Sequence, residues 1–266
     1  MRRFHLFEWE DQPWLPNVFR DFITDHLRYT QHEPMREPIS RAIAERLAAL
    51  TAATGDRRLI DLCAGAGGPL IAISRIMAED LRCPVEVVLT DLFPNVAAFK
   101  RIEAESQGRI AARYEPISAT DVPAALTGVR TMFTALHHFA PEQARGVLAD
   151  AVRKRAPIAV FEPLERTVRM IALLGVASFV RGFTHTPRVG RMTAARFLFT
   201  YVLPIAPAVF AWDGMVSALR TYTPDELREL ARSVSRDDSY QWDAGRFDVQ
   251  GPYGAMPTIY LIGRPV

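Results

Sequence analysis

The sequence predicts an α/β protein built on a doubly wound, mostly parallel sheet of seven strands, with a helical region before the sheet and a helical insertion within it. Short apolar, β-branched runs alternate with amphipathic segments between residues 57 and 165, as in parallel α/β folds. Residues 166–222 interrupt this alternation and far exceed the usual connection of about 2 to 6 residues. Two apolar strand patterns near the C-terminus then predict a hairpin-like pair that adds an antiparallel edge.

The predicted elements follow one another in a regular order. The expected strands are residues 59–62, 84–91, a third within 108–123, then 129–136, 157–163, 240–247 and 256–266. Helices are expected from about Pro69, over 98–105, and from about Pro141. A further helix covers 223–234, where Thr223 is the expected N-cap and Glu226 completes a capping box.

The chain is expected to have four parts. Before the core, the segment "NVFRDFITDHLRY" places Val18, Phe19, Phe22 and Leu27 on one apolar stripe. The four parts are an N-terminal helical cap (1–50), a ligand-binding core (51–165), a hydrophobic, arginine-rich helical lid or insertion (166–222), and a C-terminal helix and strands that complete the core (223–266).

Composition and charge narrow the class of protein. The 266 residues are 49% hydrophobic, which suffices for a sizeable core, and the net charge of +2 is too small to indicate a nucleic-acid partner. Cys63 and Cys83 are too few for a disulfide framework, and no zinc-ligand spacing is present, so no metal is expected. The first residues lack the apolar stretch of a signal peptide, so the expected location is the cytoplasm.

A glycine loop follows the first predicted strand. The run "DLCAGAGG", residues 61–68, leads into a helix, so its backbone N–H groups can hold an anionic or polar ligand. The alternative is a tight turn without a ligand. A dinucleotide fingerprint needs glycine at the first, third and sixth positions, but counting from Gly65 the sixth residue is Leu70, so that pattern fails.

The loop resembles motif I of the class I S-adenosylmethionine-dependent methyltransferases, in which alternating small residues follow an acidic one. The sequence departs from this motif at Cys63, where glycine is commoner. The resemblance covers roughly residues 57–165 and implies a Rossmann-like fold with S-adenosylmethionine as cofactor. It implies that the loop contacts this cofactor through Asp61, Cys63, Ala64, Gly65 and Gly67. Apart from this contact, Cys63 is interpreted as a small packing residue and not as a nucleophile.

Two further acidic residues match the same family pattern. Asp91 ends the second strand, where the family's acidic residue accepts the two ribose hydroxyls, and Leu92 follows it. Asp121, in "SATDVP", stands where a residue near the adenine amino group is expected. The alternatives are that Asp91 caps the helix after Pro94 and that Asp121 is an ordinary loop residue.

The candidate catalytic residues follow the fourth and fifth strands. The run "TALHHF" is similar to the Leu-His-His stretch of many small-molecule methyltransferases. His137 and His138 would lie at the C-terminal edge of the sheet, where α/β folds bind ligands, and are candidates for a general base. The alternative is that one packs against the cofactor and the other orients a loop. Glu162, at the end of strand five, is a further candidate catalytic residue, for substrate polarity or local structure. The Asn/Asp-Pro-Pro-aromatic and Pro-Cys motifs of nucleic-acid methyltransferases are absent there.

The insertion indicates the class of acceptor. Residues 166–212 hold six arginines and no Asp or Glu, interleaved with apolar runs. The run 197–212 is too short for a bilayer span of about 20 residues, and Pro204 and Pro207 interrupt it. A lid with solvated arginines is expected; contact with a membrane surface and a homodimer contact are the alternatives. We therefore expect a small hydrophobic or lipid-like acceptor. A silent S-adenosylmethionine- or S-adenosylhomocysteine-binding module on membranes is the alternative function.

Overall fold

The computed structural model describes residues 1–31, 36–235, 239–251 and 254–266. The chain forms two compact units. Unit 1 comprises Met1–Glu33 and Leu164–Tyr222, and unit 2 comprises Pro34–Pro163 and Thr223–Val266. The chain therefore leaves unit 2 after its fifth strand and returns to it at Thr223.

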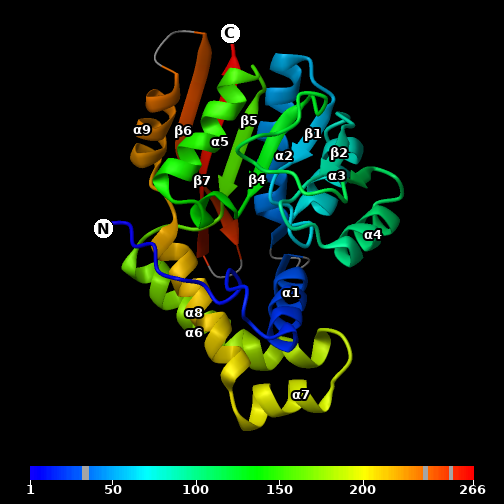
Figure 1. The fold of residues 1–266 in the computed structure, drawn as a ribbon, viewed down its shortest axis with the longest axis vertical. Helices are drawn as coiled ribbons and strands as arrows, with labels where there is room; N and C mark the ends of the chain where they lie inside the picture. Colours follow the sequence, from blue (N-terminus) through cyan, green and yellow to red (C-terminus); the bar gives the residue numbers. More distant parts are fainter. Residues whose placement is uncertain (32–35, 236–238, 252–253) are drawn as a thin grey trace. The chain divides into compact units, whose positions relative to one another are not determined.

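The described part of unit 2 contains a seven-stranded sheet in the order β3-β2-β1-β4-β5-β7-β6, which confirms the predicted architecture (Figure 1). Strands β1 to β5 pair in parallel, and β7 is antiparallel to both β5 and β6. The strand order reverses between β1 and β4, so the carboxyl ends of these neighbours border the crevice where such folds bind ligands. The strands are β1 (Arg58–Asp61), β2 (Glu86–Leu89), β3 (Ile110–Ala112), β4 (Val129–Phe133), β5 (Ile158–Glu162), β6 (Tyr240–Gly251) and β7 (Gly254–Pro265).

Helices cover both faces of this sheet, with α5 crossing in front of it and α2 lying behind it in Figure 1. Helix α2 packs against α3, and α5 packs against α9. The predicted capping box begins α9, because the Thr223 hydroxyl accepts from the Glu226 N–H and the Glu226 carboxylate accepts from the Thr223 N–H. The helices are α2 (Glu37–Thr54), α3 (Leu70–Glu79), α4 (Val96–Glu105), α5 (Pro141–Arg153) and α9 (Pro224–Val234).

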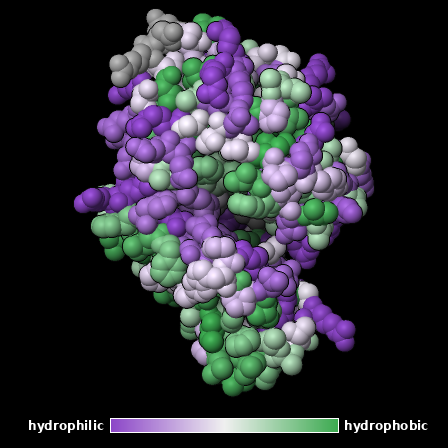
Figure 2. All heavy atoms as spheres, viewed as in Figure 1, coloured by the Kyte–Doolittle hydropathy of each residue, from purple (hydrophilic) through white to green (hydrophobic). Residues whose placement is uncertain are grey.

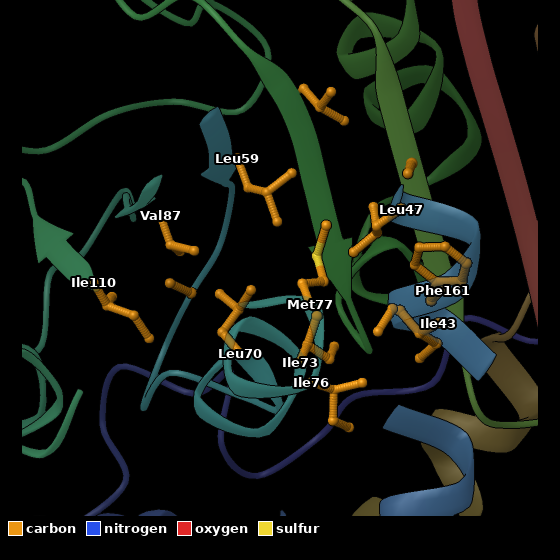
Figure 3. Close-up of a cluster of buried hydrophobic side chains, with 14 of the residues drawn as sticks. Ile43, Leu47, Leu59, Leu70, Ile73, Ile76, Met77, Val87, Ile110 and Phe161 are labelled. Carbon is orange, nitrogen blue, oxygen red and sulfur yellow. The ribbon is translucent and has the colours of Figure 1, made fainter. Parts of the chain in front are cut away.

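The main core of unit 2 lies between the sheet and the α2–α3 pair. Apolar side chains recur at helical spacing in α2 and α3, so each helix presents one continuous face to the strands. Figure 3 shows Ile43 and Leu47 of α2 and Leu70, Ile73, Ile76 and Met77 of α3 around Leu59, Val87 and Phe161 of the strands. Helix α2 thus belongs to the sheet unit, whereas the sequence placed most of it in the cap of residues 1–50.

A buried ion pair joins β4 to α5. The Arg130 guanidinium donates to Asp150 Oδ2 at 2.8 Å, and both side chains are almost completely buried. Asp150 also accepts from the Val122 N–H at 3.2 Å and lies 2.9 Å from Lys154 Nζ. This network fixes the loop after β3 against the C-terminal end of α5.

Unit 1 is helical apart from its first residues and its connections. Helices α6 and α8 pack together, and a small core joins Leu15, Phe22 and Ile23 to Ala206, Val209 and Phe210 of α8. The predicted stripe on α1 is wrong at Leu27, whose side chain is 44% exposed. His26 follows Phe22 by four residues and takes the inward position, because residues four apart share a helix face. The helices are α1 (Asn17–Gln31), α6 (Val168–His185), η3 (Thr186–Arg188), α7 (Ala194–Phe197), the π-helical η4 (Leu198–Val202) and α8 (Ile205–Arg220).

The two prolines of the apolar run behave differently. Pro204 separates η4 from α8, as the sequence predicts. Pro207 does not break the helix, because it lies in the first turn of α8, where backbone N–H groups have no intrahelical acceptor. Among the described helices, none alone is long and apolar enough to span a bilayer. The segments Ala194–Val202 and Ile205–Arg220 meet that criterion only as a pair, with a bend of 70° between them.

Candidate functional site

The glycine loop joins β1 to α3 through an unusual backbone conformation. Four of its residues have positive φ: Cys63 (59°), Gly65 (53°), Gly67 (98°) and Gly68 (47°). Glycine adopts such angles readily, whereas a residue with a side chain does so rarely. Cys63 therefore holds a left-handed conformation at the position where the family motif more often has glycine.

Gly65 and Gly67 have different surroundings. A Cβ added to Gly67 would lie 2.2 Å from Ile102 Cδ1, so Gly67 allows α4 to pack closely on the loop. A Cβ added to Gly65 would meet no heavy atom within 4 Å. The backbone at Gly65 is thus open, as a loop that cradles a ligand requires. The residues present here fit a bound cofactor tail.

Asp91, just beyond β2, orients its carboxylate toward this loop. Its Oδ2 accepts from the Gly65 N–H at 2.8 Å, and its Oδ1 accepts from the Phe93 N–H at 2.8 Å. The N-cap of α4 is Asn95, whose side chain accepts from the Ala98 N–H at 3.0 Å, so Asp91 does not cap that helix. A carboxylate has about four lone-pair sites, so each Asp91 oxygen can accept another hydrogen bond. Leu92 follows and is 46% exposed.

Asp61 lies buried at the end of β1. Its Oδ1 accepts from the Thr131 hydroxyl at 2.9 Å, and its backbone oxygen accepts from the Thr90 hydroxyl at 2.7 Å. Burial raises the pKa of the Asp61 carboxyl well above its usual value, and the nearby Asp91 charge acts in the same direction. The sequence did not single out Thr90 and Thr131, because threonine is an ordinary strand residue.

Cys63 and Ala64 complete the loop as packing residues. Burial raises the pKa of the Cys63 thiol, with Asp91 and Asp61 contributing, so the thiol stays protonated near neutral pH. A protonated thiol is a poor nucleophile, which agrees with the packing interpretation of Cys63. Ala64 is buried, and its N–H donates to the Thr90 oxygen at 3.0 Å.

His137 and Glu162 form a buried pair at the ends of β4 and β5. Glu162 Oε1 accepts from the His137 backbone N–H at 3.2 Å, and Glu162 Oε2 lies 2.9 Å from His137 Nδ1. An ionised carboxylate only accepts, so this contact places a proton on Nδ1, and Nε2 is then the nitrogen that accepts a proton when the ring is neutral. The half-buried His138 ring lies with its centroid 4.2 Å from that of His137.

The turn that presents these histidines is strained. Thr134 has a φ of 51°, which is rare for a β-branched residue, and its N–H donates to the Phe161 oxygen at 3.0 Å. The 3₁₀ turn Leu136–His138 follows directly. Such strain persists where surrounding structure maintains it, and it clusters at functional sites. Cys63 and Thr134 therefore mark the ends of two adjacent strands, β1 and β4.

Asp121 lies elsewhere in unit 2. Its Oδ1 is 2.7 Å from Nζ of Lys154, the C-cap of α5, and its side chain is 80% exposed. The hydrogen bond and charge of Lys154 lower the pKa of the Asp121 carboxyl. Helix α5 begins just after His138 and runs about 20 Å before it reaches Lys154. The structure therefore does not bring Asp121 to the glycine loop.

The segment after β3 instead contacts Asp91 through Ile117. The Ile117 N–H donates to the Asp91 backbone oxygen at 2.8 Å, which places Ser118 next to this contact in the chain. The Ser118 hydroxyl is 2.8 Å from that of Thr120. A loop serine carries no distinctive signal in a sequence, so Ser118 is not among the predicted site residues.

Comparisons with known proteins agree on the architecture. No family model and no curated protein matches the sequence. Among solved structures, the plantazolicin methyltransferase BpumL, in complex with a pentazolic desmethylPZN analog and SAH, is similar with a TM-score of 0.56 and 9% identity over 97% of this chain and 93% of that one. The complex of BpumL with a triazolic desmethylPZN analog and SAH has a TM-score of 0.56 and 11% sequence identity, over 96% of this chain and 93% of that one. A putative O-methyltransferase from Nostoc punctiforme PCC 73102 has a TM-score of 0.50 and 14% sequence identity, over 98% of this chain and 64% of that one.

The chain has the class I S-adenosylmethionine-dependent methyltransferase fold. Within this methyltransferase fold, the carboxyl ends of four adjacent strands, β2, β1, β4 and β5, carry ten of the eleven predicted site residues. The eleventh, Asp121, lies at the far end of α5. The ten are Asp61, Cys63, Ala64, Gly65, Gly67, Asp91, Leu92, His137, His138 and Glu162.

Proposed function

We propose that this protein is a methyltransferase that uses S-adenosylmethionine to methylate a small hydrophobic or lipid-like acceptor. The observation that carries the proposal is the Asp91 carboxylate, fixed by the Gly65 N–H at 2.8 Å beside an open loop backbone. When bound, S-adenosylmethionine supplies an activated methyl group on a sulfonium. The residues of this chain then have to hold the donor, orient the acceptor and exclude water.

The glycine loop and Asp91 would hold the cofactor. Asp91 keeps acceptor sites for two adjacent hydroxyls, because each of its oxygens receives one backbone hydrogen bond in the structure. The Gly65 backbone leaves room for the ligand, and the Gly67 contact with Ile102 fixes the loop on α4. The loop is therefore packed against α4 at Gly67 and open at Gly65.

His137 would take the proton from an acceptor hydroxyl or amine. Glu162 binds both the backbone N–H and Nδ1 of His137, so the ring is fixed and Nε2 is its proton-accepting atom. Such a pair does nothing for cofactor binding by itself. It therefore favours an enzyme over the silent binding module.

The insertion supports an apolar acceptor. The chain enters unit 1 two residues after Glu162, and residues 166–212 contain no Asp or Glu. Many large apolar side chains of this segment are exposed in unit 1, among them Val176 (67%) and Val202 (58%). A segment of this composition suits an apolar substrate better than a charged one.

The test is transfer of a labelled methyl group from S-adenosylmethionine to fractionated cell extracts. We expect labelled product in the organic-solvent fraction. His137→Gln should lower the transfer rate by about 100-fold or more. His5→Gln, at an exposed histidine of unit 1, serves as the matched control and should retain the rate.

Two outcomes would change the proposal. Label found only in polar, water-soluble products would overturn the acceptor class. Absence of product from every fraction, with intact S-adenosylhomocysteine binding, would favour the silent module.

A further inference from the structure

Unit 1 exposes a group of large apolar side chains where α7 and η4 meet α8. We name it the apolar corner. Figure 2 shows hydrophobic side chains gathered over this region, at the lower end of the view. Each member is between 39% and 58% exposed, although contiguous apolar surface of this kind is uncommon on soluble proteins. The corner consists of Phe197, Leu198, Tyr201, Val202, Leu203 and Ile205.

A cavity of about 560 Å³ in unit 1 continues the apolar corner, because Leu203 and Ile205 also line it. Its other walls include Phe7, Trp9 and Trp212, and all its lining residues are apolar or aromatic. The Trp212 Nε1–H donates to the Phe7 oxygen at 2.9 Å, which fixes this aromatic wall. Tryptophan is enriched where proteins meet the membrane interface, and a cavity of this chemistry suits an acyl chain.

Exposed positive charges precede the apolar corner in the chain. Arg188 and Arg191 are exposed in the connection that leads into α7. Two other arginines of this segment are turned inward, contrary to the expectation that they stay solvated. Arg166 is buried and donates to the Thr221 oxygen, and Arg196 is buried and pairs with Asp25. Residues 166–212 contain no Asp or Glu, and Asp25, which reaches this segment from α1, is paired with Arg196. The exposed Arg188 and Arg191 are therefore suited to an anionic surface.

We propose that unit 1 binds the surface of an anionic lipid bilayer through the apolar corner, with Arg188 and Arg191 facing the lipid phosphates. Helix α8 carries its opposite face into the core of unit 1, where Val209 and Phe210 pack with Phe22. The corner, rather than the whole helix, therefore enters the membrane interface, to a depth of about 5 to 10 Å. This binding does not depend on the proposed methyl transfer.

The test is flotation of the full-length protein with vesicles of phosphatidylcholine alone or mixed with phosphatidylglycerol. We expect the wild type to float with the anionic vesicles. Leu198→Ser/Val202→Ser should weaken binding by about tenfold or more, because both side chains would leave water on binding. The matched control is Leu173→Ser/Val168→Ser, which changes the same residue types at exposed positions in the N-terminal part of α6, away from the end that leads to α7. This control variant should bind vesicles like the wild type.

The arginines give a second test of the same proposal. Arg188→Gln/Arg191→Gln should lower affinity for anionic vesicles by about fivefold for each charge and remove the preference over neutral vesicles. Failure of the wild type to float, or equal losses in the corner and control pairs, would overturn the proposal. Sedimentation velocity without lipid tests the alternative that a second copy of this chain covers the apolar corner. That alternative would replace the proposal if the wild type binds no vesicles and forms a dimer that Leu198→Ser/Val202→Ser converts to a monomer.

Discussion

The Asp91 carboxylate accepts a hydrogen bond from the Gly65 N–H at 2.8 Å, which joins the carboxyl end of β2 to the glycine loop after β1. The two residues are 26 positions apart, so the contact exists only in the folded protein. It orients the carboxylate and fixes the loop at the same time.

Gly65→Ala should separate cofactor binding from stability. Its φ of 53° and that of Gly55 (76°) are both left-handed, and a Cβ at either would meet no heavy atom within 4 Å. Each alanine variant should therefore lose about 1 kcal/mol of unfolding free energy in urea titrations. The Gly65 variant should also lose S-adenosylmethionine affinity, because the methyl group fills the open loop. Equal affinities of the two variants would count against a ligand at Gly65.

Glu162→Gln should slow methyl transfer without weakening cofactor binding. The amide cannot supply the negative charge that orients and stabilises the protonated His137 ring, although it can still accept from the backbone N–H. We expect the rate of methyl transfer to fall by about 10- to 100-fold, while the affinity for S-adenosylmethionine, measured by calorimetry, stays unchanged. An unchanged rate would remove Glu162 from the proposed catalytic pair.

Arg130→Gln should destabilise the protein strongly. The change leaves Asp150 buried without its one buried guanidinium partner among the described residues, and breaking such a pair costs about 3 to 5 kcal/mol. Arg153 and Lys154 also pair with Asp150, so the lower end of that range applies. Arg58→Gln breaks an exposed pair with Glu86 and should cost less than about 1 kcal/mol. Urea unfolding of both variants tests the contrast, and similar losses would contradict it.

His26 should make unit 1 sensitive to acid. Burial lowers the pKa of His26 to about 3, with smaller contributions from His185 and Arg181, whereas in the unfolded chain it stays near 6.5. As the pH falls below about 6.5, the unfolded chain gains a proton that the folded one does not bind, so stability falls by up to about 1.4 kcal/mol per pH unit. Thermal unfolding between pH 7.5 and 5 should show this loss in the wild type and a smaller one in His26→Gln. An equal slope in both would contradict the assignment.

The sheet and most of the site could be predicted from the sequence because their signals are local. Apolar runs define the buried strands, and a residue at the end of a parallel strand must lie at the ligand-binding edge. The positions of Asp91, His137 and Glu162 at this edge were predicted in this way. The capping box at Thr223 was equally local, since its partner Glu226 is three residues away.

The features that the sequence did not predict depend on contacts between residues that are far apart in the chain. Asp121 matched a sequence pattern, but its position depends on Lys154, which is 33 residues further along the chain. The inward arginines were missed for the same reason, because Arg196 pairs with Asp25 across 171 residues. The Thr131 hydroxyl that binds Asp61 lies 70 residues from it. No periodicity in the sequence encodes these partners.

Calorimetric titration with S-adenosylmethionine tests the central claim most directly. We expect the wild type to bind, and Asp91→Ala to bind at least about tenfold more weakly, because hydrogen bonds to a charged group contribute about 1.5 to 3 kcal/mol each. Asp121→Ala, which removes an aspartate beside Lys154, should bind like the wild type. No binding by the wild type, or undiminished binding by Asp91→Ala, would contradict the account.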